Sequence, residues 1–427
     1  MQSKIIIEAQ DCLPIKCNEE VSAALFYFVS SISSNIYHFS KKQKDEEPIV
    51  YFDYQNRQWM ANRYIGECEF VFNNQNYILK IAPRFGHELL LKIYEYIYST
   101  KLPPSLHTLA KIKAIDIHKL LISVIWTSYL KKGLKHGLYK INKQIKEQGT
   151  VIRGKFLVRD SLISIKANNN LFYSYAIKEI DNIPNNILIR AYVILKKNYF
   201  LNESFLSNSI KMDLKRLSNI LDLNSNLVYN DYKKIKYSNL YAIYKPLIDL
   251  SWEIITNKHL GINQSEKVGN SFFLDMAELW EFFIHKILGK SLIPLGWSFI
   301  NNELAIYEST FYKRKLIPDI ILERNDKILV FDAKYKRMNY SNLDVDRDDV
   351  FQIHTYSYYF DKLHKEIHSG LIYPLEHRNE KELEKHTILT KANNKSYFFI
   401  EGLEVNNPDL FEQNIECFIN AIKLKLN

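Results

Sequence analysis

Residues 316–336 (LIPDIILERNDKILVFDAKYK) constrain the fold of this chain more than any other stretch. Two runs rich in Ile, Leu, Val and Phe flank a polar turn, which is the pattern of a β-hairpin. The same strands carry Asp319, Asp332 and Lys334. Because an unpaired buried charge is heavily penalised, we expect these three charges to pair with one another or to bind a metal ion.

The alternation of side chains along a strand places Asp332 and Lys334 on the same face of the sheet. If the polar turn closes a hairpin, Asp319 approaches the same edge. Two carboxylates and the Ala333 backbone carbonyl would then form part of the oxygen shell that Mg²⁺ prefers. A bound metal ion lowers the pKa of a coordinated water, and Lys334 could orient or deprotonate that water. The alternative interpretation is a salt-bridged hairpin at the surface.

The composition indicates a folded protein that suits a polyanionic partner. The 427 residues predict two or three domains, and 47% apolar residues supply their cores. The net charge of +9, with 29 Tyr and 24 Phe, favours contacts with phosphates and bases. A compositional bias of the genome would also produce these counts.

Cysteine usage and hydropathy predict the compartment. The four cysteines are sparse and widely spaced, which favours thiols in a reducing compartment over a zinc site or disulfides. The first ten residues lack the apolar core of a signal peptide, and an apolar run such as 120–126 is far too short to cross a bilayer. We therefore expect a cytoplasmic protein with no membrane partner.

Periodicity and turn signals divide the chain into three expected regions. Residues 1–105 are predicted to be mixed α/β, 106–265 mainly helical, and 266–427 an α/β core. The expected elements are a helix at 22–32, a hairpin at 66–86, a short strand pair at 150–162, a linker at 261–271, a helix at 273–292, strands at 297–309, 316–322 and 328–333, and a helix at 348–361. Neither common glycine-rich phosphate-binding motif occurs, so the sequence predicts no nucleotide site.

Several ordered motifs resemble one nuclease family. The Pro-Asp at 318–319 followed by Asp-Ala-Lys at 332–334 looks like the PD-(D/E)xK nuclease signature. More closely, the whole hairpin resembles the McrC subunits of McrBC-type restriction systems. Further stretches that are similar to this family lie at 151–158, 181–195, 277–284 and 349–360. The resemblance implies a restriction-endonuclease-like α/β core in the C-terminal region.

The resemblance also implies the site residues. Asp319, Asp332 and Lys334 would form the metal and catalytic centre, with Mg²⁺ or Mn²⁺ as cofactor. A helix glutamate is the usual further ligand. Helical phase favours Glu281, at the edge of the apolar arc, over Glu278, which is expected to lie nearer solvent. An ordinary solvated carboxylate is the alternative.

On the next expected helix, Gln352 matches the family's glutamine and could bind a water or a phosphate. It could equally be a helix-surface side chain.

The function implied by the resemblance is that of a DNA endonuclease subunit. Its partner would be a GTP-hydrolysing AAA+ motor of the McrB type, and the N-terminal region would dock on the motor and stimulate its GTPase activity. Lys80 and Arg84, near the end of the first hairpin, are candidate docking contacts, or else solvated basic residues. The alternatives are a stand-alone DNA repair nuclease and a non-catalytic activator of a motor. The two aspartates and the lysine argue against a decayed site.

Overall fold

The computed structural model describes residues 4–31, 36–37, 47–99, 101–102, 104, 107–108, 117–162, 171–199, 201, 203, 206–223, 227–256, 268–305, 315–336, 345–361, 365–376, 386–387 and 396–426. The chain divides into two compact units, one spanning Met1–Ile115 and Leu260–Asn427 and the other Asp116–His259. The mixed α/β fold expected from the sequence is confirmed. The three-region division at 105 and 265 stays a prediction.

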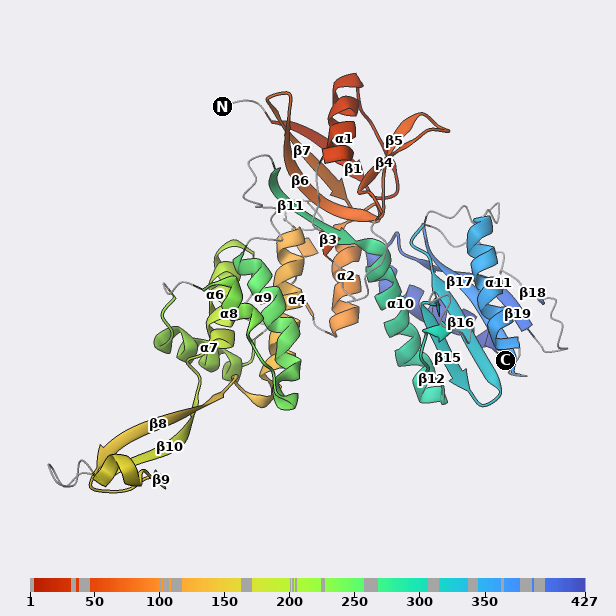
Figure 1. Cartoon of the computed structure of the whole chain (residues 1–427). Coiled ribbons are helices and arrows are strands. Elements are labelled where there is room, and N and C mark those ends of the chain that lie inside the picture. Colours follow the sequence, from red (N-terminus) through yellow and green to blue (C-terminus); the bar gives the residue numbers. More distant parts are fainter. Residues whose placement is uncertain are drawn as a thin grey trace. The chain divides into compact units, whose positions relative to one another are not determined.

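The first unit contains a five-stranded sheet of mostly N-terminal strands (Figure 1). Its order is β1 (Ile5–Gln10), β7 (Gln75–Ala82), β6 (Tyr64–Phe72), β11 (Val268–Asp275) and β3 (Ile36–Tyr37). The expected hairpin at 66–86 is confirmed as β6 and β7, and its turn holds Asn73 and Asn74 at φ angles of 49° and 60°. Asparagine tolerates this left-handed conformation, which a two-residue hairpin turn requires.

Two helices and a smaller sheet accompany these strands. The helix expected at 22–32 is confirmed as α1 (Glu19–Ser31), which packs on β6. A three-stranded sheet has the order β2 (Pro14–Ile15), β5 (Gln58–Ala61) and β4 (Val50–Asp53). Helix α2 (His87–Tyr98) follows β7 directly.

Strand β11 corrects two expectations. Residues 268–271 were expected in a linker and 273–275 in a helix, but Val268–Asp275 pairs antiparallel with β6. Phe273 and Leu274 are fully buried there, so a long-range sheet contact overrides the local turn signal. Asp275 then caps α10 (Met276–Leu292) by accepting hydrogen bonds from the backbone N–H groups of Ala277 and Glu278. The rest of the expected linker, residues 261–267, lies outside the described residues.

The C-terminal residues form a six-stranded sheet in the same unit. Its order is β12 (Ser298–Phe299), β15 (Ile320–Arg324), β16 (Lys327–Ala333), β17 (Glu366–Leu375), β19 (Ser396–Glu404) and β18 (His386–Thr387). The predicted hairpin is confirmed as the antiparallel pair β15 and β16, while β16, β17 and β19 run parallel. Nine of the ten residues of β17 are buried, as expected for a parallel strand covered on both faces.

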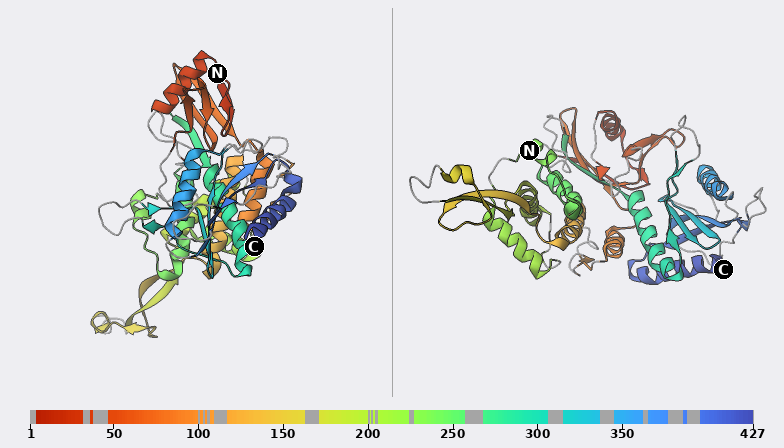
Figure 2. Two further views of the ribbon diagram at one scale, coloured as in Figure 1. Left: turned by 90° about the vertical axis from the view of Figure 1, so that its right-hand side faces the viewer. Right: turned by 60° about the horizontal axis from the view of Figure 1, so that its bottom comes forward.

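Three helices cover this sheet. Helix α11 (Arg347–Asp361), confirmed where a helix was expected at 348–361, packs on β16 and β17. Helix α12 (Phe411–Leu426) packs on β19, and α10 contacts β16, α12 and α2. Figures 1 and 2 show α11 on one face and the α10–α12 pair on the other. Of the strand expected at 297–309, the described residues contain β12 and β13 (Leu304–Ala305), the latter paired with β14 (Lys315–Leu316).

The second unit is mainly helical, as expected. Its helices of ten or more residues in the described part are α4 (Ile117–Gly133), α6 (Ile183–Asn198), α7 (Asn208–Ile220) and α9 (Lys245–Ile255). A ribbon of β8 (Ile141–Gly149) and β10 (Leu171–Glu179) projects from these helices (Figure 1), with β9 (Lys155–Phe156) at its side. The ribbon was not predicted. The strand pair expected at 150–162 is wrong except for β9, because residues 158–162 are helical.

None of the helices in the described ranges combines the length and the apolar character needed to cross a membrane.

Candidate active site

The two aspartates of the hairpin meet at one edge of the sheet, as predicted. Ile320 pairs with Phe331 in the antiparallel register, so the next pair outward is Asp319 and Asp332. Oδ2 of Asp319 accepts a hydrogen bond of 2.9 Å from the backbone N–H of Ala333. Only 2% of Asp332 is exposed. The hairpin turn thus fixes both carboxylates by backbone geometry.

Lys334 connects the hairpin to α11. Its Nζ lies 2.6 Å from Oδ2 of Asp332 and 3.3 Å from Oδ1 of Asp349. It also donates a 2.7 Å hydrogen bond to Oε1 of Gln352, whose Nε2 donates to the Tyr356 hydroxyl at 2.7 Å. The structure therefore brings Gln352 to the site, where its amide orients the Lys334 ammonium.

The electrostatic environment keeps Lys334 charged. Burial lowers the pKa of Lys334, but the nearby carboxylates of Asp332, Asp349 and Asp319 outweigh burial, and the net pKa lies above its ordinary value. This charge suits Lys334 to orient a water and to balance negative charge. Its action as a base on a water stays a prediction.

Helix α10 brings two glutamates to the site, and one placement corrects the sequence analysis. Glu278 was expected nearer solvent, yet only 1% of it is exposed. The expectation from helical phase assumed that the polar face of α10 is exposed to solvent. Instead the N-terminal sheet lies against the start of the helix, where Met276 N–H donates to the Arg63 carbonyl and Arg63 Nε lies 3.2 Å from Asp275 Oδ2. Glu281, which is partly exposed, faces the same space.

These side chains line an open hollow of about 1080 Å³. Both α10 glutamates, the two hairpin aspartates, Lys334 and Gln352 contribute to its wall. The N-terminal strands contribute as well, and the lining residues include Cys12, Glu47, Tyr51, Asn62 and Arg63. The positive side chains around the acidic centre are those of Arg63, Lys315, Lys334 and Lys336.

The donor types suit a hard divalent cation. The carboxylates of Asp319 and Asp332 and the Ala333 carbonyl are oxygen ligands of the kind that Mg²⁺ prefers. Within the described part of the chain, no three acidic, imidazole or thiolate side chains are close enough to form a complete metal site. Mg²⁺ commonly binds to one or two carboxylates and keeps several waters, so a partial protein shell is compatible with it.

Two residues near the site were missed or misplaced by the sequence analysis. Asp349 is 4% exposed and contacts Lys334, Lys336 and the Tyr373 hydroxyl. The sequence signal that could have identified Asp349 is its position one helical turn before Gln352. Arg84 was a candidate for an exposed docking contact, but its side chain is only 3% exposed. Lys80 is 48% exposed, 3.7 Å from Glu67, and remains a candidate.

The fold and the site define a mixed α/β protein whose hairpin presents two carboxylates and a lysine in an open hollow. The family described as "McrBC 5-methylcytosine restriction system component" matches residues 60–374. Because this match covers more than half of the sequence, the chain belongs to the McrBC family. No curated protein matches the chain.

Two solved structures are similar to this chain to different degrees. A chain in the refined half-complex from the tetradecameric assembly of Thermococcus gammatolerans McrB AAA+ hexamers with bound McrC is 13% identical, with a TM-score of 0.57 over 99% of this chain and 100% of that chain. A chain in the cryo-EM structure of the Thermococcus gammatolerans McrBC complex is 16% identical, with a TM-score of 0.36 over 68% of this chain and 88% of that chain. The first similarity shows a common fold.

Proposed function

We propose that this chain is the Mg²⁺-dependent DNA endonuclease subunit of a McrBC-like restriction complex, with a PD-(D/E)xK-type core. The observation that carries the proposal is the convergence of Asp319, Asp332 and Lys334 at one sheet edge inside an open, partly basic hollow. Membership of the McrBC family supports the same activity.

Each site residue has a defined task in phosphodiester hydrolysis. Asp319 and Asp332, with Glu281 or Glu278, would hold Mg²⁺ or Mn²⁺. The bound cation lowers the pKa of a coordinated water and offsets negative charge on the phosphate. Lys334, held by Gln352, orients the attacking water and stabilises the charge that develops on the phosphate oxygens. Arg63, Lys315 and Lys336 around the hollow would contact the DNA backbone.

The proposed partner is a GTP-hydrolysing AAA+ motor of the McrB type, which recognises and translocates the DNA while this chain cuts it and stimulates the GTPase. A chain in an assembly of McrB AAA+ hexamers with bound McrC has a similar fold, which supports this partner. The competing proposals are a stand-alone repair nuclease and a non-catalytic activator.

The test is co-purification with a McrB-type protein, followed by cleavage of methylated and unmethylated plasmids with GTP and Mg²⁺. We expect a stable complex that cuts the methylated plasmid only when GTP is present. Cleavage by this chain alone, without any such partner, would favour the repair nuclease. Binding and GTPase stimulation without cleavage would favour the activator.

A further inference from the structure

A buried arginine lies beneath the candidate active site. Arg84 follows β7 and is 3% exposed, and Asp11, which follows β1, is fully buried. The Arg84 backbone N–H donates a 2.5 Å hydrogen bond to Oδ1 of Asp11, while Nε of Arg84 lies 4.0 Å from Oδ2. Among the residues that the structure describes, none accepts a hydrogen bond from the Arg84 guanidinium. Replacing both Asp11 and Arg84 by apolar side chains would avoid the cost of burying two charges, whereas replacing Arg84 alone would leave the buried Asp11 without its counter-charge.

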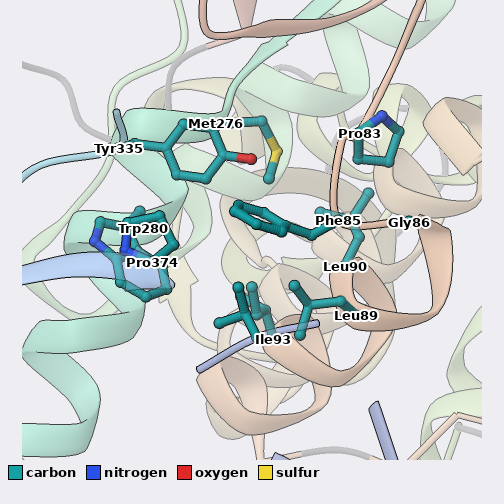
Figure 3. Close-up of a pocket in the computed structure, with 11 residues that line it drawn as sticks. Pro83, Phe85, Gly86, Leu89, Leu90, Ile93, Met276, Trp280, Tyr335 and Pro374 are labelled. Atoms are coloured by element: carbon teal, nitrogen blue, oxygen red, sulfur yellow. The ribbon is translucent and has the colours of Figure 1, made fainter. Parts of the chain in front are cut away.

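The guanidinium instead lies between two aromatic rings. Its Cζ is 4.6 Å from the centroid of the Tyr335 ring and 4.7 Å from that of Phe85, which are distances of cation–π contacts. Figure 3 shows Phe85 facing Tyr335 and Trp280 across a small apolar cavity of about 10 Å³. Tyr335 is 5% exposed and 6.4 Å from Trp280 of α10, ring centre to ring centre. Residues that follow β7 and the helix α10 therefore both contact this tyrosine.

Tyr335 directly follows Lys334 in the sequence. Contacts that fix Tyr335 therefore also affect the position of Lys334. The backbone N–H of Lys334 donates to the Ile372 carbonyl at 2.9 Å, and Sγ of Cys12 lies 3.8 Å from the Tyr335 carbonyl oxygen. Lys334 and Tyr335 both line the hollow, and the Tyr335 ring is held by contacts with Arg84 and Phe85, which follow β7.

We propose that Arg84, together with Asp11, is a positioning residue of the nuclease centre, acting through Tyr335 to fix the strand end that carries Asp332 and Lys334. The proposal rests on the proposed nuclease function. It makes the N-terminal sheet part of the scaffold of the active site, in addition to any docking role. A force applied to this sheet by a bound motor would then reach the catalytic residues through one buried contact.

The experiment uses the full chain in complex with its AAA+ GTPase. Arg84→Met removes the charge and keeps a long apolar side chain, Arg84→Lys keeps the charge without the planar guanidinium, and Tyr335→Leu removes the aromatic ring that contacts Arg84. Lys4→Met is the matched control, because Lys4 is a half-exposed cation directly before β1 of the same sheet. Asp332→Ala is measured in parallel. The readouts are the single-turnover cleavage rate as a function of DNA concentration, the stimulation of GTP hydrolysis, and the melting temperature.

For Arg84→Met we expect a maximal cleavage rate roughly tenfold to a hundredfold lower, since small misplacements of catalytic groups have effects of this size. DNA affinity and GTPase stimulation should stay unchanged, Arg84→Lys should recover part of the rate, and Lys4→Met should match the wild type. If Arg84→Met does not fold, the cleavage rate of Tyr335→Leu tests the positioning role in its place.

Three results would overturn the positioning role. They are a wild-type maximal rate in folded Arg84→Met, a wild-type maximal rate in folded Tyr335→Leu, and a defect confined to DNA affinity. If Asp332→Ala still cleaves, the nuclease assignment itself fails. Inactive Asp332→Ala together with fully active Arg84 and Tyr335 variants rejects the positioning role alone.

Discussion

At the scale of single residues, Lys334 holds together side chains that would otherwise repel. Its ammonium lies within 2.6 Å of Asp332 and 3.3 Å of Asp349, two carboxylates that are at most 5% exposed. In this arrangement, the lysine supplies part of the positive charge that offsets these carboxylates, and a bound cation would supply more. Lys334 therefore has a structural role in addition to the catalytic role that we propose for it.

Removal of this lysine should destabilise the fold and make it depend on metal. Lys334→Ala leaves two buried carboxylates without their shared ammonium, and breaking such a buried pair costs roughly 3 kcal/mol or more. We expect a lower melting temperature in EDTA, and a larger rise on adding Mg²⁺ than in the wild type. Thermal unfolding with and without Mg²⁺ measures both. An equal response of the two proteins to Mg²⁺ would contradict a metal site at these carboxylates.

The contributions of the two α10 glutamates to metal binding can be distinguished by isosteric substitution. Glu278→Gln and Glu281→Gln keep side-chain size but remove the negative charge that favours a metal ion. We expect at least one of them to raise the Mg²⁺ concentration needed for half-maximal cleavage. A Mg²⁺ titration of both variants is the measurement, with Asp326→Ala in the exposed hairpin turn as control. Wild-type titrations for both would remove α10 from the metal site.

At the scale of elements, His285 connects α10 to β12, although the residue as a whole is exposed to solvent. Its ring stacks on Phe299 with centroids 4.0 Å apart. Burial lowers the pKa of His285 below its ordinary value of 6.5, and Lys286 lowers it further. Since the unfolded chain binds the proton more readily, the neutral ring favours the folded state above pH 6.5, and this advantage is lost as the pH falls toward the lowered pKa.

His285→Phe should therefore flatten the pH dependence of stability. The ring stack on Phe299 is retained, but no proton is bound. We expect the free energy of unfolding of the wild type to fall, relative to the variant, as the pH is lowered below 6.5. Chemical denaturation at several pH values measures this difference. A constant difference across that range would show that His285 does not carry the lowered pKa.

The ribbon of the second unit has its own conformational requirement. Gly154 has φ +79°, and a Cβ there would lie 2.6 Å from the Ser174 carbonyl oxygen. Gly154→Ala should cost about 1 kcal/mol or more and loosen β8 and β10 locally. Hydrogen exchange should show lower protection of these amides, while Gly149→Ala, whose Cβ would make only ordinary contacts at 3.5 Å, should not. Equal protection in the two variants would contradict this account.

How far the sequence predicts these elements depends on the range of the contacts. The β15–β16 hairpin and its carboxylate pair were predictable, because a local turn and side-chain alternation determine them. Strand β11 was not, since it pairs with a strand about 200 residues earlier in the sequence and its own residues resemble a linker. The burial of Glu278 and Arg84 was missed for the same reason. Both are covered by segments that no local pattern brings together.

At the scale of the whole molecule, the proposed cleavage site and the proposed docking region lie on different parts of the chain. The six-stranded sheet carries the proposed cleavage site, Cys12, Glu47, Tyr51 and residues 61–63 contribute to its wall, and the N-terminal region is the proposed docking region. A substitution confined to Asp332 lies on the C-terminal sheet and does not change Lys80 or the rest of the N-terminal surface. Cleavage and motor stimulation should therefore be separable.

The most direct test is a paired measurement on Asp332→Ala in the reconstituted complex. Nicking of a methylated plasmid and phosphate release from GTP are followed in the same reaction, with circular dichroism confirming the fold. Our account predicts that cleavage falls by on the order of 10²-fold or more while GTP hydrolysis stays at the level stimulated by the wild type. Wild-type cleavage by the folded variant would contradict the proposed active site, and loss of GTPase stimulation would place the motor contact in the nuclease core.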